Sequence, residues 1–76
     1  MPNRAMPAVD SSAIRAIDYD AAAARLEILF VTGRRYAYAN VPPHIYADML
    51  ASPSKGEYFN AHIRDRYAFD RVAGRD

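Results

Sequence analysis

The chain has 76 residues and no cysteine, which limits it to one small domain and excludes disulfides and thiolate chemistry. Its net charge of +1 is smaller than the basic excess that marks a strong electrostatic footprint for nucleic acid. Nine of the ten basic residues are nonetheless arginine, the residue better suited to phosphate contacts and base stacking.

Other classes of protein are disfavoured by the residue pattern. No apolar run approaches the roughly 18 residues of a membrane span, and the first residues lack the apolar segment of a secretory signal, so we expect a cytoplasmic protein without membrane contact. His44 and His62 have no thiolate partners, and three scattered glycines cannot form a phosphate loop, so no metal, cofactor or small-molecule substrate is expected. A homodimer interface or a host protein is expected to support so small a domain.

In chain order, residues 1–11 contain two prolines and no hydrophobic periodicity, and we expect them to form a flexible tail. Residues 12–72 are expected to form the domain, and residues 73–76 to fray. The first strand is predicted at residues 13–19, with one irregularity because Ile17 breaks the alternation that includes Ile14.

Alternating apolar residues predict two further strands, at 25–32 and 35–41, joined in a hairpin at Gly33. A loop with an odd number of residues is favoured, since it places Phe30 opposite Tyr36 and Ile28 opposite Tyr38. A two-residue loop would instead put the tyrosines on the face of Val31 and Leu29. In the favoured register one face of the hairpin is apolar and points toward the helices; its residues are Leu26, Ile28, Phe30, Tyr36 and Tyr38. Ala37 and Ala39 point outward on the other face.

Two short helices are predicted next. Pro42 and Pro43 end the third strand and suit the first turn of a helix at residues 43–51. A second helix, at 54–64, begins with a capping box in which Ser54 accepts from the Glu57 N–H and the Glu57 carboxylate accepts from the Ser54 N–H. Tyr67 to Phe69 is a candidate last extended segment. The expected fold class is α+β, a three-stranded antiparallel sheet followed by two helices packed on one face.

Catalytic patterns are sparse. Asp18 and Asp20 share one face of the first strand and could bind a cation or act as an acid pair, or simply end a solvated strand at a turn. Helical spacing spreads Ser54, His62 and Asp65 over several turns, so they do not form a nucleophile and base. We therefore do not expect an enzyme.

Basic and aromatic residues supply a stronger lead. Arg34 and Arg35 lie at the hairpin tip, Lys55 at the start of the second helix, and Arg64 and Arg66 after its end. If these positions converge, their side chains form a phosphate-binding patch. Base contacts have three candidates, Tyr36, Tyr38 and His62. The competing interpretation is that both tyrosines fill the core under the helices, as the favoured register implies.

Several dispersed motifs resemble the KTSC domain over about residues 9–72. They are Val9-x-Ser11-Ser12-x-Ile14, Tyr19-Asp20, Leu26-x-Ile28-x-Phe30, Gly33, Tyr36-x-Tyr38, Val41-Pro42, Tyr46, Ser54-x-Gly56-x-Tyr58-Phe59-Asn60, Ile63-Arg64 and Tyr67. That family occurs at the C-terminus of some lysyl-tRNA synthetases and as short stand-alone bacterial proteins. The resemblance implies tRNA or other RNA as a partner and brings no catalytic residues. One departure is Asp18, where the family commonly has glycine.

The leading hypothesis is therefore a non-catalytic binding module for RNA or tRNA that uses the basic patch. The alternative is a protein-interaction or homodimerising module, whose outward Ala37, Ala39 and Leu29 pair with a partner. Salt dependence separates the two, because phosphate contacts weaken with salt and apolar contacts do not.

Overall fold

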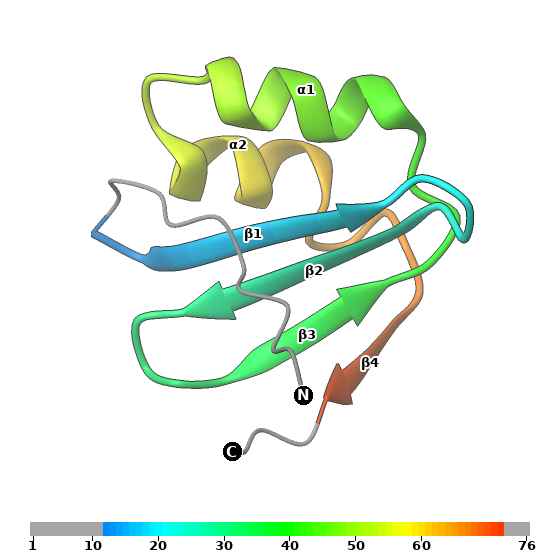
Figure 1. Cartoon of the computed structure of the whole chain (residues 1–76). Helices are drawn as coiled ribbons and strands as arrows, with labels where there is room; N and C mark the ends of the chain where they lie inside the picture. The colour runs from blue at the N-terminus through cyan, green and yellow to red at the C-terminus, as the bar shows by residue number, and fades with distance from the viewer. Residues whose placement is uncertain (1–11, 73–76) are drawn as a thin grey trace, which may run out of the picture.

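The computed structural model describes residues 12–72, so the predicted flexible ends lie outside the described residues. Within this range four antiparallel strands form one sheet in the order β1-β2-β3-β4, and two helices lie on one side of it (Figure 1). The α+β class is confirmed, with one strand more than predicted. The elements are β1 (Ile14–Asp20), β2 (Arg25–Phe30), β3 (Arg35–Tyr38), α1 (Pro43–Ala51), α2 (Lys55–His62) and β4 (Phe69–Val72).

Strand β1 contains the irregularity that its sequence predicts. Ile14 lies opposite Phe30, yet Ala16 lies opposite Leu29, so Arg15 is an extra residue in the ladder. This bulge resets the alternation and lets Ile14 and Ile17 both enter the core, where each is fully buried.

The β2–β3 hairpin has an odd loop, as predicted, but the predicted residue pairs are wrong. Ile28 lies opposite Tyr36 and Leu26 opposite Tyr38, a shift of two residues along β2. The reason is a three-residue loop: the Phe30 N–H donates to the Arg34 carbonyl at 2.9 Å, and Gly33 takes a φ of 94° inside the loop. A shift of two residues preserves the face of every side chain, so the tyrosines still lie on the helix side.

Strand β4 corrects the prediction of three strands. Phe69 pairs with Tyr38 and Arg71 pairs with Tyr36, so the segment near Tyr67 continues into the sheet, and Val72 belongs to the strand. Strand β3 is shorter than predicted, because its ladder ends at Tyr38 and Asn40 has a φ of 58°.

Helix α1 has the predicted bounds and buries Ile45 and Met49. Helix α2 is shorter than predicted, and half of its capping box forms. The Glu57 N–H donates to the Ser54 hydroxyl at 3.3 Å, whereas the Ser54 N–H donates to the Ser52 hydroxyl at 3.2 Å. Ser52 thus replaces the Glu57 carboxylate as the second partner of the cap.

The core lies between the helix side of the sheet and the two helices. Its fully buried residues are Ile14, Ile17, Leu26, Ile28, Val41, Met49 and Ile63. Tyr19 attaches the loop before α1 to the sheet, because its hydroxyl donates to the Val41 carbonyl at 2.6 Å. Its ring also stacks on that of Tyr46, with the ring centroids 5.2 Å apart. Within residues 12–72, neither helix is long and apolar enough to cross a membrane.

Candidate functional site

Five aromatic side chains form a closed ring on the helix side of the sheet. Their ring centroids lie 5.7 Å apart for Phe30–Tyr36, 5.4 Å for Tyr36–Phe69, 5.4 Å for Phe69–Tyr38, 5.6 Å for Tyr38–Phe59 and 5.3 Å for Phe59–Phe30. Each ring therefore touches two others, mostly edge to face, which is a preferred geometry for aromatic pairs. The ring joins β2, β3, β4 and α2.

The same five side chains line a cleft with a volume of about 280 Å³, whose remaining lining residues are Arg64 and Asp65. We call these seven residues the aromatic cleft. Tyr38 is 3% exposed and belongs to the core, whereas Phe69 is 53% exposed. Phe30 and Tyr36 are half-buried. The core interpretation thus holds for Tyr38, while Tyr36 and Phe69 present ring surface to solvent.

Arg64 and Asp65 reach the cleft because α2 ends immediately before them. The N–H groups of Ile63 and Arg64 both donate to the Phe59 carbonyl, at 3.0 and 2.9 Å, which closes the last turn. The pKa of Tyr38 is raised to about 12, chiefly by burial and further by Tyr36 and Asp65, while Arg64 acts to lower it. Both charged residues therefore act on the Tyr38 hydroxyl at the cleft.

A second hollow adjoins the aromatic cleft and shares Phe30 and Tyr36 with it. Its volume is about 450 Å³, and its other lining residues are Ser12, Ala13, Val31, Thr32 and Arg34. Arg34 thus lies on the helix-side surface next to the aromatic cleft. Arg71 belongs to the same face, because it is the cross-strand partner of Tyr36.

The five predicted cations do not meet in one patch within the described residues. Arg35 points to the opposite face of the sheet from Tyr36, since side chains alternate along β3. The Lys55 ammonium donates to the Ser52 carbonyl at 2.8 Å and so binds the end of α1. Arg66 is exposed in the segment that follows α2. The structure brings together Tyr36, Tyr38 and Arg64, with Arg34 beside them.

His62 has a packing contact of its own. Its ring lies 4.3 Å from that of Tyr58, one turn earlier on α2. It is not among the residues that line the aromatic cleft. Ser54 caps α2, His62 packs on Tyr58, and Asp65 lines the aromatic cleft. These three side chains therefore do not share one site.

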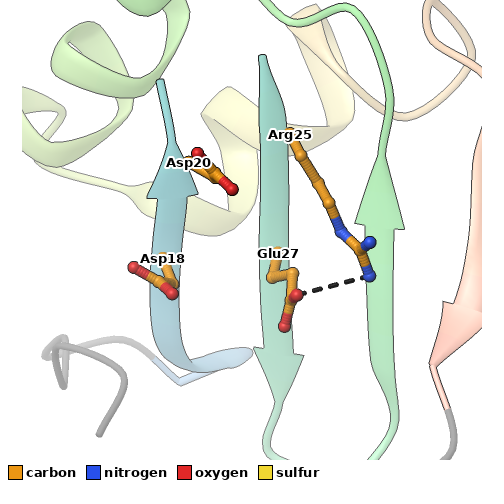
Figure 2. A pocket seen from close by; sticks show the side chains of 4 residues that line it. All are labelled: Asp18, Asp20, Arg25 and Glu27. Atoms are coloured by element: carbon orange, nitrogen blue, oxygen red, sulfur yellow. Dashed lines mark ion pairs between the residues drawn. The ribbon is translucent and has the colours of Figure 1, made fainter. Parts of the chain in front are cut away.

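The helix-free face of the sheet is charged. Figure 2 shows Asp18, Asp20, Arg25 and Glu27 around a hollow of about 130 Å³, with the Arg25–Glu27 ion pair at 3.4 Å. The Asp20 carboxylate accepts from the Ala22 N–H at 3.1 Å, so it opens a turn. Among the residues that the structure describes, no group of three or more His, Cys, Asp or Glu is placed to hold a metal.

The predicted self-association residues lie on or beside this face, but they are unequally exposed. Ala37 is only 7% exposed, although Ala39 is exposed and Leu29 is half-buried. In the register of the sheet, Ala37 lies between Glu27 and Asp70, and long neighbours shield so small a side chain. A second copy placed on this face would meet carboxylates rather than a continuous apolar surface.

Sequence reasoning missed three residues of the helix-side surface. Phe69 ended the candidate extended segment but was not predicted to pair in the sheet, Arg71 lay beyond that segment, and Asp65 was considered only as a catalytic acid. Phe30 was expected on the inward face of the sheet, and both Phe30 and Phe59 line the cleft. The local signal for β4 is the alternation of Tyr67 and Phe69, which indicates an extended segment but not its partner strand.

Comparisons with known proteins agree with this fold. The family model described as KTSC domain matches residues 10–67. A protein of Tsukamurella paurometabola is 40% identical over 62 residues, which are 82% of this chain and 92% of that protein. The crystal structure of a KTSC domain protein from Yersinia pestis superposes with a TM-score of 0.87 at 29% identity, covering 90% of this chain and 96% of that one.

A longer relative contains the domain as a small part. A lysine–tRNA ligase of Nostoc punctiforme is 33% identical over 64 residues, which are 84% of this chain and 11% of the ligase. The family match covers most of the chain, and both the sheet and the helices are shared with a solved member. The chain therefore belongs to the KTSC domain family.

Proposed function

We propose that the protein is a non-catalytic module that binds single-stranded RNA on the helix side of its sheet. The observation that carries the proposal is the aromatic cleft, in which an exposed ring, Phe69, lies beside Arg64 and Asp65. Aromatic rings on a sheet stack unpaired bases, and each stacked base is worth about 1–3 kcal/mol on substitution to alanine.

The distribution of charge supports this face over the other. Around the aromatic cleft the cations Arg34, Arg64 and Arg71 outnumber the single acid Asp65. Among residues paired in the ladders, the helix-free face carries four acids, Asp18, Asp20, Glu27 and Asp70, against Arg25 and Arg35. A polyanion is therefore attracted to the cleft side and repelled from the opposite side.

The relatives support RNA as the polyanion that the protein binds. A domain of this kind matches 11% of a lysine–tRNA ligase, a protein named for tRNA. An RNA ligand also implies a cytoplasmic location, which suits a chain without cysteine.

The test is a titration of the whole protein with a single-stranded oligoribonucleotide at several salt concentrations. Contacts of Arg34 and Arg71 with two phosphates predict a log–log salt slope of about −1.4. Arg34→Ala should weaken binding and flatten the slope by about 0.7. Arg35→Ala removes the same charge from the same hairpin on the opposite face and serves as the matched control.

Equal loss of affinity in the two arginine variants would contradict the proposed face. A salt-independent association of the protein with itself, measured by sedimentation, would instead favour the homodimerising alternative.

A further inference from the structure

We propose that the aromatic cleft holds one unpaired guanine base, read by the carboxylate of Asp65 and the guanidinium of Arg64. This inference rests on the proposed function and names the base that the site selects. It uses the juxtaposition of an exposed aromatic ring with two adjacent side chains of opposite charge.

The size of the aromatic cleft fits a single base. Its volume of about 280 Å³ lies just below the range of roughly 300–1,000 Å³ that drug-sized ligands occupy. A planar group of the size of one base can enter such a cleft. The neighbouring nucleotide would then lie in the adjoining hollow, which Arg34 lines.

The stacking surface comes from the ring pair at the solvent edge. Phe69 is 53% exposed, and its centroid lies 5.4 Å from that of Tyr36. Tyr38 and Phe59 are buried behind it and fix its position through their own contacts. A base that covers Phe69 removes apolar ring surface from water and keeps its polar edge toward the open end of the cleft.

The charged pair matches the edge of guanine. A carboxylate only accepts hydrogen bonds, and a guanidinium only donates them. Guanine places two neighbouring donors, N1–H and the N2 amino group, on its Watson–Crick edge, which one carboxylate can accept together. Its O6 and N7 acceptors suit an arginine. Adenine and cytosine present a ring-nitrogen acceptor where the Asp65 carboxylate needs a donor, and uracil offers a single donor between two carbonyls.

Aromatic rings around a small cleft also suit a quaternary ammonium group, which binds to ring faces. Arg64 disfavours that ligand, because it lines the same cleft and offsets the attraction that Asp65 exerts on a cation. A neutral base with both donors and acceptors meets no repulsion from Arg64. The lining residues therefore favour a nucleobase over a quaternary ammonium group such as that of trimethylated lysine.

The experiment compares four pentaribonucleotides, UUGUU, UUAUU, UUCUU and UUUUU, titrated into the whole protein and followed by amide chemical shifts. UUGUU should bind about tenfold more tightly than the other three, because one good bidentate contact discriminates between bases by about this factor. Asp65→Asn should abolish that preference, so that UUGUU no longer binds more tightly than UUUUU. Asp70→Asn makes the same change on the helix-free face and should leave the preference intact.

Phe69→Ala tests the stacking contact separately. It should weaken all four oligonucleotides by about 5- to 150-fold. Because Phe69 is half-exposed, this variant should keep its fold, which circular dichroism checks.

Equal affinities for the four oligonucleotides, or a guanine preference that survives Asp65→Asn, would overturn the guanine assignment. The proposed function survives either result if Arg34→Ala still weakens binding. Binding of none of the oligonucleotides would contradict the proposed function itself. Binding of tetramethylammonium at the cleft more tightly than UUGUU would overturn the assignment in favour of a cation-binding cage.

Discussion

Replacing Tyr38 by alanine tests whether the aromatic ring is a structural unit. Tyr38 is 3% exposed and touches Phe59 at 5.6 Å and Phe69 at 5.4 Å. Truncating a buried aromatic residue costs about 3–5 kcal/mol. A domain of 76 residues has a total stability of about 4–11 kcal/mol, so Tyr38→Ala removes a large share of it. The melting temperature should fall by about 15 °C or more.

Urea denaturation followed by circular dichroism measures this loss. Tyr38→Phe keeps the ring and should cost less than about 1.5 kcal/mol, as volume-conserving changes do. Tyr36→Ala truncates a half-buried ring two positions along the strand and should cost about half as much as Tyr38→Ala. If Tyr38→Ala loses less than about 1 kcal/mol, the ring does not hold the sheet to α2, and the account of the core is wrong.

Three further outcomes follow from the structure. The raised pKa of Tyr38, about 12 against an ordinary 10, stabilises the neutral phenol in the folded state. The contribution of Tyr38 to the free energy of unfolding should therefore be fully present below pH 10 and fall by about 2–3 kcal/mol as pH rises to 12, a loss that Tyr38→Phe removes in alkaline denaturation. Gly33→Ala should cost about 1–2 kcal/mol from its φ of 94° alone, because no atom lies within 4 Å of the added methyl group, and Gly33→Asn should cost less in the same melt. Ser54→Ala should cost about 1 kcal/mol by loss of the α2 cap, whereas Glu57→Ala should cost only a few tenths, since Ser52 replaces its carboxylate; equal losses in urea would refute this cap.

Local pattern explains which parts of the fold were predictable. The alternation from Leu26 to Phe30 predicts β2, and Pro42 and Pro43 mark the start of α1. Both signals are local and depend little on tertiary contacts. The hairpin register was wrong by two residues, because alternation fixes a face and only the loop fixes the pairing. Strand β4 has one apolar and one aromatic residue around a charged pair, and it forms because β3 offers a free edge.

The site was predictable only in part, for reasons of geometry. Tyr36, Tyr38 and Arg64 were identified from residue type and do line one cleft. Arg35 was misplaced because two adjacent strand residues point to opposite faces, and Lys55 because a nearby carbonyl takes its ammonium group. Phe69 and Asp65 join the cleft through tertiary contacts that no sequence spacing records.

The most direct test of the central claim is an amide chemical-shift titration of the protein with a single-stranded oligoribonucleotide. The account predicts that the shifted residues cluster on the helix side, at Tyr36, Arg64 and Phe69, with Arg34 at the edge. Shifts that concentrate instead on Asp18 and the rest of the helix-free face, or no shifts at millimolar oligonucleotide, would contradict it.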